Sequence, residues 1–513
     1  MVVSPDTATL STGNTQQFRV SGLVRSSSIA TQEVSWAIVG GVGTIDATGL
    51  FTATAEGTGT VEARVGSLTG RARVTVTGQG QQVSRGRTIS GKVKNILSTN
   101  EVISSAVILA GGKTAISGSD GTYQLAGVSS TVDAISAAVP GFVSTTIQST
   151  SESINIPMGY PVQSSSYSYP SESTLVKGKL VDGSGNPISS TSLRIILWDP
   201  SYTISSGGYT GSDGSFSLSV SIPKNIASLT GYIMVVKDIS GTYKGVINKI
   251  TLIRGVTLEV GDIVVDGEVA TLTGTVTPSS GFSLYSVTCG IQITPANRLD
   301  LSTAYSWSGI SGNQYTIRVP VTPAGEKYYI CARGVKGNDS VSKYLTDLVV
   351  GAGTQTYNLD LPQGIVLTYP ASEQSGISTT PKFEWLSLGS SYGYLVVVGN
   401  NFGVKWWGFT KGTSLTYPSF PVGSAGENTN LQNGQMYYVW VAGYENPNLD
   451  INDLKAEDIN NATAYSQMAS IPFSVGSASG TSVRSYDVRG KEEFDKRVRE
   501  FLKGLRGGEW GDD

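Results

Sequence analysis

The sequence contains no histidine. This absence excludes every mechanism that needs an imidazole as a base or as a metal ligand, including His-dependent serine and cysteine hydrolases and zinc proteases. Chemistry carried by carboxylates alone, such as glycoside hydrolysis, remains open. None of the 39 Asp and Glu residues forms an acidic pair framed by a recognisable motif. We therefore expect no enzyme, no catalytic residue, no metal site and no cofactor.

Charge, cysteine and long apolar segments are also scarce. Only 15% of the residues are charged and the formal net charge is -3, which provides no attraction for nucleic acid. No apolar run approaches the roughly 20 residues that cross a bilayer. Residues 1–5 show neither the basic nor the apolar segment of a signal peptide. We expect an extracellular or cell-surface protein in its mature form, with the signal peptide removed.

Glycine is abundant, with 63 residues, and a short phrase built around an Asp-Gly turn recurs along the chain. After the turn at Asp213-Gly214, apolar residues alternate with serines from Ser215 to Ile222. This alternation predicts a half-buried strand that starts from a tight turn. The phrase also occurs at 118–125 and, in a weaker form, at 312–317. The chain is therefore predicted to be a tandem array of small β-domains.

Residues 1–78 form the first predicted domain. Its motifs are Val34-Ser35-Trp36, the turn and strand at Gly43–Ala53, and the alternating strand at Val61–Val65. Their order resembles the bacterial immunoglobulin-like domain, group 2. The resemblance implies a spacer or adhesion module of bacterial surface proteins.

Three further domains are predicted to share one fold. Residues 86–159 and 174–266 resemble carboxypeptidase regulatory-like domains, which are transthyretin-type β-sandwiches, in their opening strands and Asp-Gly turns. Residues 268–362 are a third, divergent copy. The resemblance implies a non-catalytic stalk or accessory role. Related surface domains carry Lys–Asn isopeptide bonds, and no Lys/Asn/acid trio stands out in this sequence.

Residues 364–476 resemble a bacterial fibronectin type III domain in three strands, at 381–385, 393–398 and 434–442. A polar insertion from Asn446 to Thr463 exceeds what that family needs, and we expect a solvated loop with one helical turn at 452–460. Linkers are predicted at 78–82, 160–173 and 476–480. A charged tail follows at 483–513. The predicted fold is thus all-β, with the sandwiches in an elongated array and a short C-terminal amphipathic helix.

The adjacent residues Trp406 and Trp407 are the candidate ligand-stacking site. Neighbouring residues of a strand face opposite sides, so at most one of the two rings belongs to the core and the other is expected to be exposed. An exposed Trp stacks well on a sugar ring. The alternative is that the insertion or a neighbouring domain covers it, and we favour that alternative.

Cys289 and Cys331 lie in one predicted domain of a chain that otherwise avoids cysteine. In an oxidising compartment they are expected to form a disulfide between strands. The alternative is a pair of buried thiols that act as small apolar side chains.

The tail carries the clearest helix of the sequence, predicted from Lys491 to Leu505. Its apolar residues recur at helical spacing and share one face: Phe494, Val498, Phe501, Leu502 and Leu505. An isolated helix of this length is marginal in water, so the face needs a surface to cover it. That surface is either the fibronectin-like domain of the same chain or a partner such as the next subunit.

The function predicted from these features is that of a non-catalytic extracellular structural protein, either a cell-surface stalk or a subunit of an extracellular fibre. The expected partners are other proteins or further copies of the chain in a homo-polymer, with a glycan as a candidate ligand. An adhesin or carbohydrate-binding protein that uses the fibronectin-like domain is the second hypothesis. An accessory region of a secreted hydrolase is the third.

Overall fold

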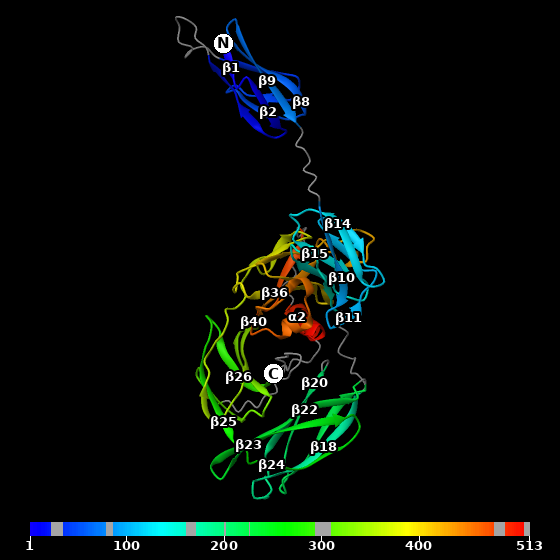
Figure 1. Cartoon of the computed structure of the whole chain (residues 1–513), viewed down its shortest axis with the longest axis vertical. Helices are drawn as coiled ribbons and strands as arrows, with labels where there is room; N and C mark the ends of the chain where they lie inside the picture. Colours follow the sequence, from blue (N-terminus) through cyan, green and yellow to red (C-terminus); the bar gives the residue numbers. More distant parts are fainter. Residues whose placement is uncertain are drawn as a thin grey trace. The chain divides into compact units, whose positions relative to one another are not determined.

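We describe a computed structural model of the chain, which covers residues 1–21, 34–77, 86–160, 171–199, 202–224, 226–292, 309–476 and 488–506 (Figure 1). The linkers predicted at 78–82 and 477–480, and most of the linker predicted at 160–173, lie outside these ranges. The chain divides into two compact units, residues 1–87 and 88–513. Each unit is described by itself.

The first unit is a β-sandwich, called sandwich 1. Its sheets have the orders β1-β4, β2-β9-β8-β5 and β3-β7-β6. Phe18, Phe51 and Val61 are fully buried at its centre. Its strands are β1 (Val2–Ser4), β2 (Thr7–Ser11), β3 (Thr15–Gln17), β4 (Arg19–Ser21), β5 (Ser35–Val39), β6 (Gly43–Ile45), β7 (Leu50–Ala53), β8 (Gly57–Val65) and β9 (Leu68–Thr77).

Sandwich 2 (residues 88–159) opens the second unit. One of its layers has the order β11-β10-β14, with β17 beside β10, and the other has the order β13-β12-β15-β16. Its strands are β10 (Arg87–Asn95), β11 (Ser98–Val102), β12 (Val107–Ala110), β13 (Lys113–Ile116), β14 (Thr122–Val128), β15 (Ala134–Ala138), β16 (Ser144–Gln148) and β17 (Ile156–Met158).

Sandwich 3 (residues 171–265) has the layers β21-β18-β24 and β20-β19-β22-β23. Its strands are β18 (Ser171–Val181), β19 (Ser192–Asp199), β20 (Tyr202–Tyr209), β21 (Ser215–Pro223), β22 (Ser228–Ile239), β23 (Thr242–Ile253) and β24 (Leu258–Val264).

Sandwich 4 (residues 269–361) has a layer β27-β28-β25-β31, with β32 beside β25, and a layer β26-β29-β30. Its strands are β25 (Val269–Thr277), β26 (Ser283–Gln292), β27 (Gly309–Ser311), β28 (Gln314–Pro320), β29 (Lys327–Lys336), β30 (Asp339–Leu348), β31 (Gly353–Thr356) and β32 (Leu359–Asp360).

Sandwich 5 (residues 365–475) has a small layer β33-β35-β38 and a larger layer β37-β36-β39-β40, with β41 beside β39 and β34 beside β41. Its strands are β33 (Leu367–Tyr369), β34 (Gln374–Ile377), β35 (Lys382–Trp385), β36 (Tyr392–Asn400), β37 (Gly403–Thr410), β38 (Ser414–Thr416), β39 (Met436–Glu445), β40 (Ala464–Gln467) and β41 (Ile471–Val475).

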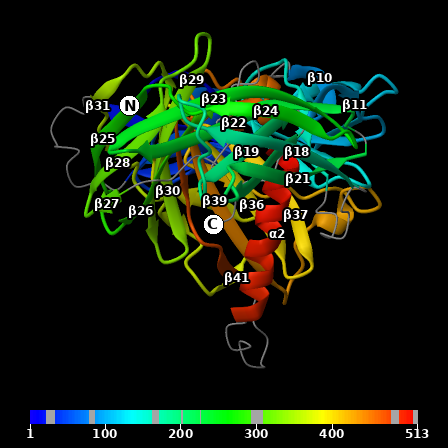
Figure 2. The same cartoon turned by 90° about the horizontal axis from the view of Figure 1, so that it is seen from below.

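The described helices lie within sandwich 5 or after it in the sequence. Two short 3-10 turns, η2 (Glu427–Thr429) and η3 (Ile451–Asp453), and the helix α1 (Ala456–Asn460) fall between its strands. The helix α2 (Val488–Arg506) follows the sandwich and contacts β36, β37 and β39 (Figure 2). In the described part of the chain, no helix is both long enough and apolar enough to span a membrane.

The Asp-Gly turns explain how the repeated phrase starts a strand. Asp120 Oδ1 accepts hydrogen bonds from the backbone N–H of Thr122, at 3.1 Å, and from its hydroxyl. Asp213 makes the same pair of contacts with Ser215. The glycines that follow have φ of +73° at Gly121 and +77° at Gly214, a region that glycine enters without steric cost. Each turn aspartate is therefore satisfied locally, as the sequence predicts.

Neighbours in the structure are not always neighbours in the sequence. One sheet has 13 described strands. Eleven of them follow the order β13-β12-β15-β16-β37-β36-β39-β40-β30-β29-β26, with β41 attached beside β39 and β34 beside β41, so the sheet includes one layer each of sandwiches 2, 5 and 4. Sandwich 5 thus lies between sandwiches 4 and 2 in this sheet (Figure 1). The fold is all-β apart from its short helices, as predicted.

The hydrophobic cores follow the same arrangement. Sandwiches 1 and 3 and one face of sandwich 5 each have a core of their own, and the core of sandwich 4 also takes in a few residues of sandwich 3. A further core is shared: it combines the interior of sandwich 2 with the other face of sandwich 5 and the apolar face of α2. We call the place where sandwiches 2 and 5 meet the joint.

Candidate functional site at the joint of two sandwiches

The joint is built around a parallel pairing between β16 and β37. Its register runs from Ser144 opposite Trp406 to Ile147 opposite Phe409. The β16 side chains of Ser144, Thr145 and Thr146 are at most 1% exposed, although all three are polar. Such a strand resembles a solvent-facing edge in sequence, and it is buried here because β37 completes its hydrogen bonding.

Two of these buried hydroxyl groups, those of Ser144 and Thr146, have hydrogen-bond partners that offset the cost of their burial, whereas Thr145 Oγ1 has none. The Trp406 Nε1–H donates to Thr146 Oγ1 at 2.8 Å, and that hydroxyl also lies 2.7 Å from Ser136 Oγ. The Ser144 hydroxyl donates to the Lys405 carbonyl at 3.0 Å. These bonds connect sandwich 2 with sandwich 5 at fixed positions and so define the register of the joint.

The expected stacking site at Trp406 and Trp407 is wrong, because both side chains are 0% exposed. The two rings do face opposite sides of β37. Trp406 packs in the core of sandwich 5, with its ring centroid 4.9 Å from that of Tyr417. Trp407 points into the shared core, so sandwich 2 and α2 cover it, which agrees with the favoured alternative of cover by a neighbouring part of the chain. Neither ring is free to stack on a sugar.

The helix α2 covers the same face of sandwich 5. The predicted helix is present, and Phe494, Val498, Phe501 and Leu502 are at most 7% exposed; the side chain of Leu505 lies outside the described residues. The Phe494 ring stacks on Tyr438 with centroids 5.4 Å apart, and the Phe501 ring lies 6.3 Å from that of Trp407. The apolar face is therefore used within the chain, which fits the first of the two alternatives, docking onto the fibronectin-like domain of the same chain, and not the second, docking onto a partner.

Salt bridges on α2 match the expected helical spacing in part. Glu493 and Arg497 pair at 3.1 Å, as their four-residue spacing predicts. Asp495 pairs with Lys491 at 2.8 Å, also at a spacing of four, and accepts a hydrogen bond from the backbone N–H of Ser470. That last bond ties the helix to the chain just before β41.

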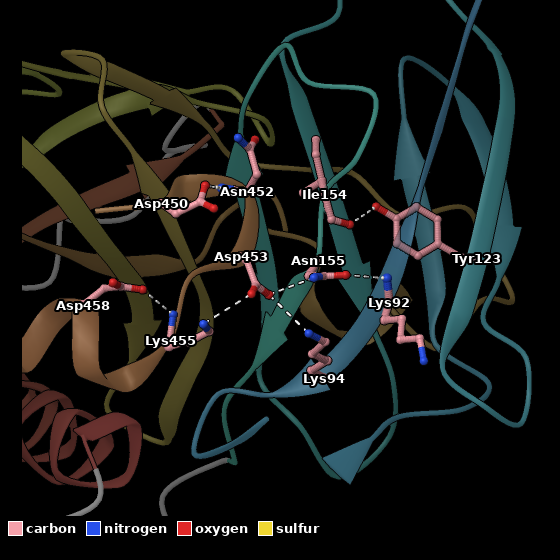
Figure 3. Close-up of polar contacts among 10 residues, drawn as sticks. All are labelled: Lys92, Lys94, Tyr123, Ile154, Asn155, Asp450, Asn452, Asp453, Lys455 and Asp458. Carbon is pink, nitrogen blue, oxygen red and sulfur yellow. Dashed lines mark hydrogen bonds and ion pairs between the residues drawn. The ribbon is translucent and has the colours of Figure 1, made fainter. Parts of the chain in front are cut away.

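The polar insertion of sandwich 5 forms the second part of the joint (Figure 3). Asp453 Oδ1 accepts hydrogen bonds from Asn155 Nδ2 at 2.8 Å and from Lys94 Nζ at 3.2 Å. Lys455 lies 3.5 Å from the other oxygen of the same carboxylate. The backbone N–H of Asn155 donates to the Asn452 carbonyl at 2.7 Å. The insertion was expected to be a solvated loop, and its helical turn is present, but its η3 turn is a contact surface for sandwich 2.

The insertion thus places Asp453 next to Lys94 and Asn155, and this Lys/Asn/acid trio does not stand out in the sequence. Burial alone would raise the pKa of Asp453, but the hydrogen bonds from Asn155 and Lys94 outweigh it and hold the pKa below its ordinary value of 3.8. Asp453 is therefore ionised at neutral pH and forms an ion pair with the Lys94 ammonium. The ion pair joins sandwich 2 to sandwich 5 across the joint, with 3.2 Å between Lys94 Nζ and Asp453 Oδ1.

We expect Asp453→Asn to lower the free energy of unfolding of residues 88–513 by about 1 kcal/mol at neutral pH, since hydrogen bonds to charged groups contribute about 1.5–3 kcal/mol and partial exposure reduces that. Because the pKa of Asp453 is depressed in the folded state, its contribution is present above pH 3.8 and is lost as the pH falls through the folded pKa. Urea unfolding across this range should therefore show the variant and wild type converging in acid. Glu457→Gln, at an exposed position of α1, is the control. A difference that stays constant with pH would contradict the assignment.

The cysteines do not form the predicted disulfide. Both are free, on neighbouring strands β26 and β29. Cys289 lies opposite Ile330, whereas Cys331 lies opposite Thr288, so the register differs by one residue. Successive side chains point to opposite faces of a sheet, which places the two thiols on opposite faces. The alternative of two free thiols therefore fits the structure, with Cys289 buried and Cys331 partly exposed.

Native protein is expected to leave both thiols unmodified during a brief treatment with a thiol reagent. Burial raises the pKa of Cys331 to about 12 and that of Cys289 still higher, so neither forms much thiolate at neutral pH. Alkylation in denaturant without reductant, followed by mass spectrometry, should add two labels. Protein that carries no label after denaturation would show that the two cysteines do form a disulfide.

Outside the joint, a hollow with a volume of about 570 Å³ lies on sandwich 3. It is shallow and is lined by Lys177 and Lys179, Glu259 and Asp262, and the ring of Tyr209, which is 75% exposed. Among the described residues, no group of three or more Cys, Asp or Glu side chains is positioned to hold a metal ion.

Comparison with solved structures gives weak likenesses. The TIE protein of Bacillus anthracis is 11% identical with a TM-score of 0.15, over 70% of this chain and 74% of that one. A streptococcal ancillary pilin is 11% identical with a TM-score of 0.13, over 53% of this chain and 90% of that one. A 9R-lipoxygenase from Cyanothece is 15% identical with a TM-score of 0.13, over 18% of this chain and 16% of that one. TM-scores this low support no argument about function.

Sequence comparison is informative for the first unit alone. No curated protein matches the sequence. The carboxypeptidase regulatory-like and fibronectin type III resemblances therefore stay predictions. Residues 1–76, by contrast, match the family of the bacterial Ig-like domain, group 2, which confirms the resemblance predicted for the N-terminal sandwich.

Proposed function

We propose that the protein is a non-catalytic structural protein of the cell surface or the extracellular space, either a stalk or a subunit of a fibre. The observation that carries this proposal is the joint: sandwiches that are far apart in sequence share one sheet and one core. Its polar and aromatic contacts join parts of the same chain, namely Trp406 with Thr146, Asp453 with Asn155, and Phe494 with Tyr438. The N-terminal bacterial Ig-like sandwich fits a surface location.

A second joint supports the same interpretation. Sandwiches 4 and 5 are connected by the antiparallel pairing of β30 with β40, from Ser340 opposite Gln467 to Lys343 opposite Ala464. The Lys343 ammonium lies 2.6 Å from a Glu445 carboxylate oxygen beside this pairing. Main-chain pairing between domains restrains their relative rotation, which suits a part that must hold its shape.

The location is tested by labelling intact cells of the source organism with an amine-reactive biotin reagent that does not cross membranes. A surface protein is labelled to the same degree before and after lysis, whereas a cytoplasmic control is labelled after lysis alone. Electron microscopy of the purified native protein then separates fibres from single particles. Labelling of this protein after lysis alone would reject the proposal.

Glycan binding is the second candidate function. Because Trp406 and Trp407 are buried, its candidate site is the hollow on sandwich 3. An exposed aromatic ring beside hydroxyl, ammonium and carboxylate groups is the usual composition of a shallow sugar site. Tyr209→Ala is expected to abolish saturable binding on a glycan array, because it removes the stacking surface. Tyr285→Ala, at a ring that is 53% exposed on sandwich 4, is the matched control. Equal binding by both variants, or none by wild type, would reject this candidate.

A further inference from the structure

The joint connects two parts of the second unit that lie near its opposite ends in sequence. Sandwich 2 begins with β10, and sandwich 5 with α2 closes the described chain. The chain between them, residues 160–364, contains sandwiches 3 and 4. It follows sandwich 2 at its N-terminal end and leads into sandwich 5 at its C-terminal end. The joint therefore closes a long loop of folded chain.

We propose that the joint is a force-sensitive closure that keeps sandwiches 3 and 4 free of tension until it opens, and then releases them as reserve length. This inference deepens the proposed structural function, which supplies the setting in which the chain is pulled. The closure itself is a property of the fold and is testable on the isolated protein.

The path of tension follows from the pairing of the strands. Tension from the N-terminal side enters sandwich 2 at β10, and tension from the C-terminal side enters sandwich 5 through α2 and β41. The two sides meet directly across the β16–β37 pairing, the shared core and the Asp453 contacts. Sandwich 3 and sandwich 4 branch off this path, since sandwich 4 is attached to sandwich 5 at β40.

The joint is expected to open before the sandwiches that it protects. Its β16–β37 ladder has four residue pairs, whereas the β22–β23 ladder inside sandwich 3 has twelve and the β18–β21 ladder has nine. Part of the joint is also accessible to solvent, since the Lys94 side chain is 21% exposed and that of Asp453 is 32% exposed. Water therefore has access to the ion pair as it separates.

Detachment of α2 is the first step of this sequence. Its C-terminal end receives the tension, and its attachment consists mainly of one apolar face on sandwich 5. Once it leaves, Trp407 loses the Phe501 contact and the shared core becomes open to water on that side. The ladder then separates, and residues 159–366 join the tension path, adding up to about 70 nm when fully extended at ~3.4 Å per residue.

The test uses a reversible lock. The Ser149 hydroxyl of sandwich 2 lies 2.6 Å from Asn452 Oδ1 of the insertion, so the pair Ser149→Cys and Asn452→Cys places two thiols across the joint. The full chain is held by enzymatically ligated handles at its two ends in an optical trap. The same molecules are pulled oxidised, with the lock closed, and then in reductant, with the lock open. Ser149→Cys alone controls for the native cysteines.

We expect oxidised and reduced molecules to have the same extension at low force, because the joint is closed in both. As force rises, the reduced molecules should show a release step that the oxidised ones lack, followed by the unfolding of two further sandwiches. Asp453→Ala should move this step to lower force.

Two results would overturn the proposal. Reduced molecules that are already longer at low force would show that the joint is open in solution. Reduced molecules without a release step before the other domains unfold would show that the joint is not the weaker element. Both results are independent of surface labelling, so a failure here is distinguishable from a failure of the proposed function.

Discussion

Replacing Trp407 with alanine is expected to lower the free energy of unfolding of residues 88–513 by about 3–5 kcal/mol, which is the usual cost of truncating a buried aromatic side chain. The side chain is 0% exposed and belongs to the core shared by sandwich 2, sandwich 5 and α2. Its removal leaves a cavity that the surrounding strands cannot fill, because β37 is fixed by pairing on both of its edges.

Chemical denaturation followed by intrinsic fluorescence and by hydrogen exchange of β16 measures this effect. Phe402→Ala is a matched control, since this aromatic residue precedes β37 directly and is 82% exposed. It should change the stability by less than about 0.5 kcal/mol. Trp407→Phe should fall between the two, because the ring volume is partly kept. A Trp407→Ala protein as stable as the Phe402→Ala protein would show that the joint does not form in solution.

Phe494→Ala is expected to detach α2, with a loss of about 3–5 kcal/mol in its docking. The ring is 0% exposed and stacks on Tyr438. An isolated helix of this length is marginal in water, so a detached α2 should also lose helicity. Hydrogen exchange over residues 488–506 should rise by two orders of magnitude or more, because about 1.4 kcal/mol corresponds to a factor of ten in an equilibrium constant.

Lys496→Ala is the control on the same helix, because its side chain is exposed and alanine favours helix. Analytical ultracentrifugation of Phe494→Ala distinguishes the use of α2 within the chain from its use between subunits. A variant that keeps its stability and loses self-association would reject the intramolecular assignment.

The local structure was predictable because its causes are local. Alternating residues from Ser215 to Ile222 gave the strand β21, whose apolar side chains are all at most 5% exposed. The Asp-Gly turns and the helical spacing of Phe494, Val498 and Phe501 likewise act over a few residues. The match of residues 1–76 to a known family confirms the first resemblance.

The joint was not predictable because its causes lie about 260 residues apart. The Ser-Thr-Thr sequence of β16 gives no sign of burial without knowledge of β37. Cover for one ring of the Trp pair was favoured from the sequence, but the strands and helix that cover Trp407 could not be identified, because they belong to other parts of the chain. Asp453 appeared as one acid of a solvated loop, since Lys94 and Asn155 reach it only in the folded structure. The predicted disulfide is absent for a different reason. Cys289 and Cys331 are offset by one residue in the pairing of β26 with β29, and their spacing in sequence does not specify this offset.

The pairing of β16 with β37 also constrains how the chain acquires its fold. At about 5–20 residues per second, a ribosome needs on the order of 15–50 s to make the 260 residues between the two strands. Until then sandwich 2 has an unpaired edge strand and an uncovered core, the features that recruit other chains into aggregates. Such distant pairing is slow to form. A chain of this design therefore has its most vulnerable period during its own synthesis, when a chaperone that shields the β16 edge would be most useful.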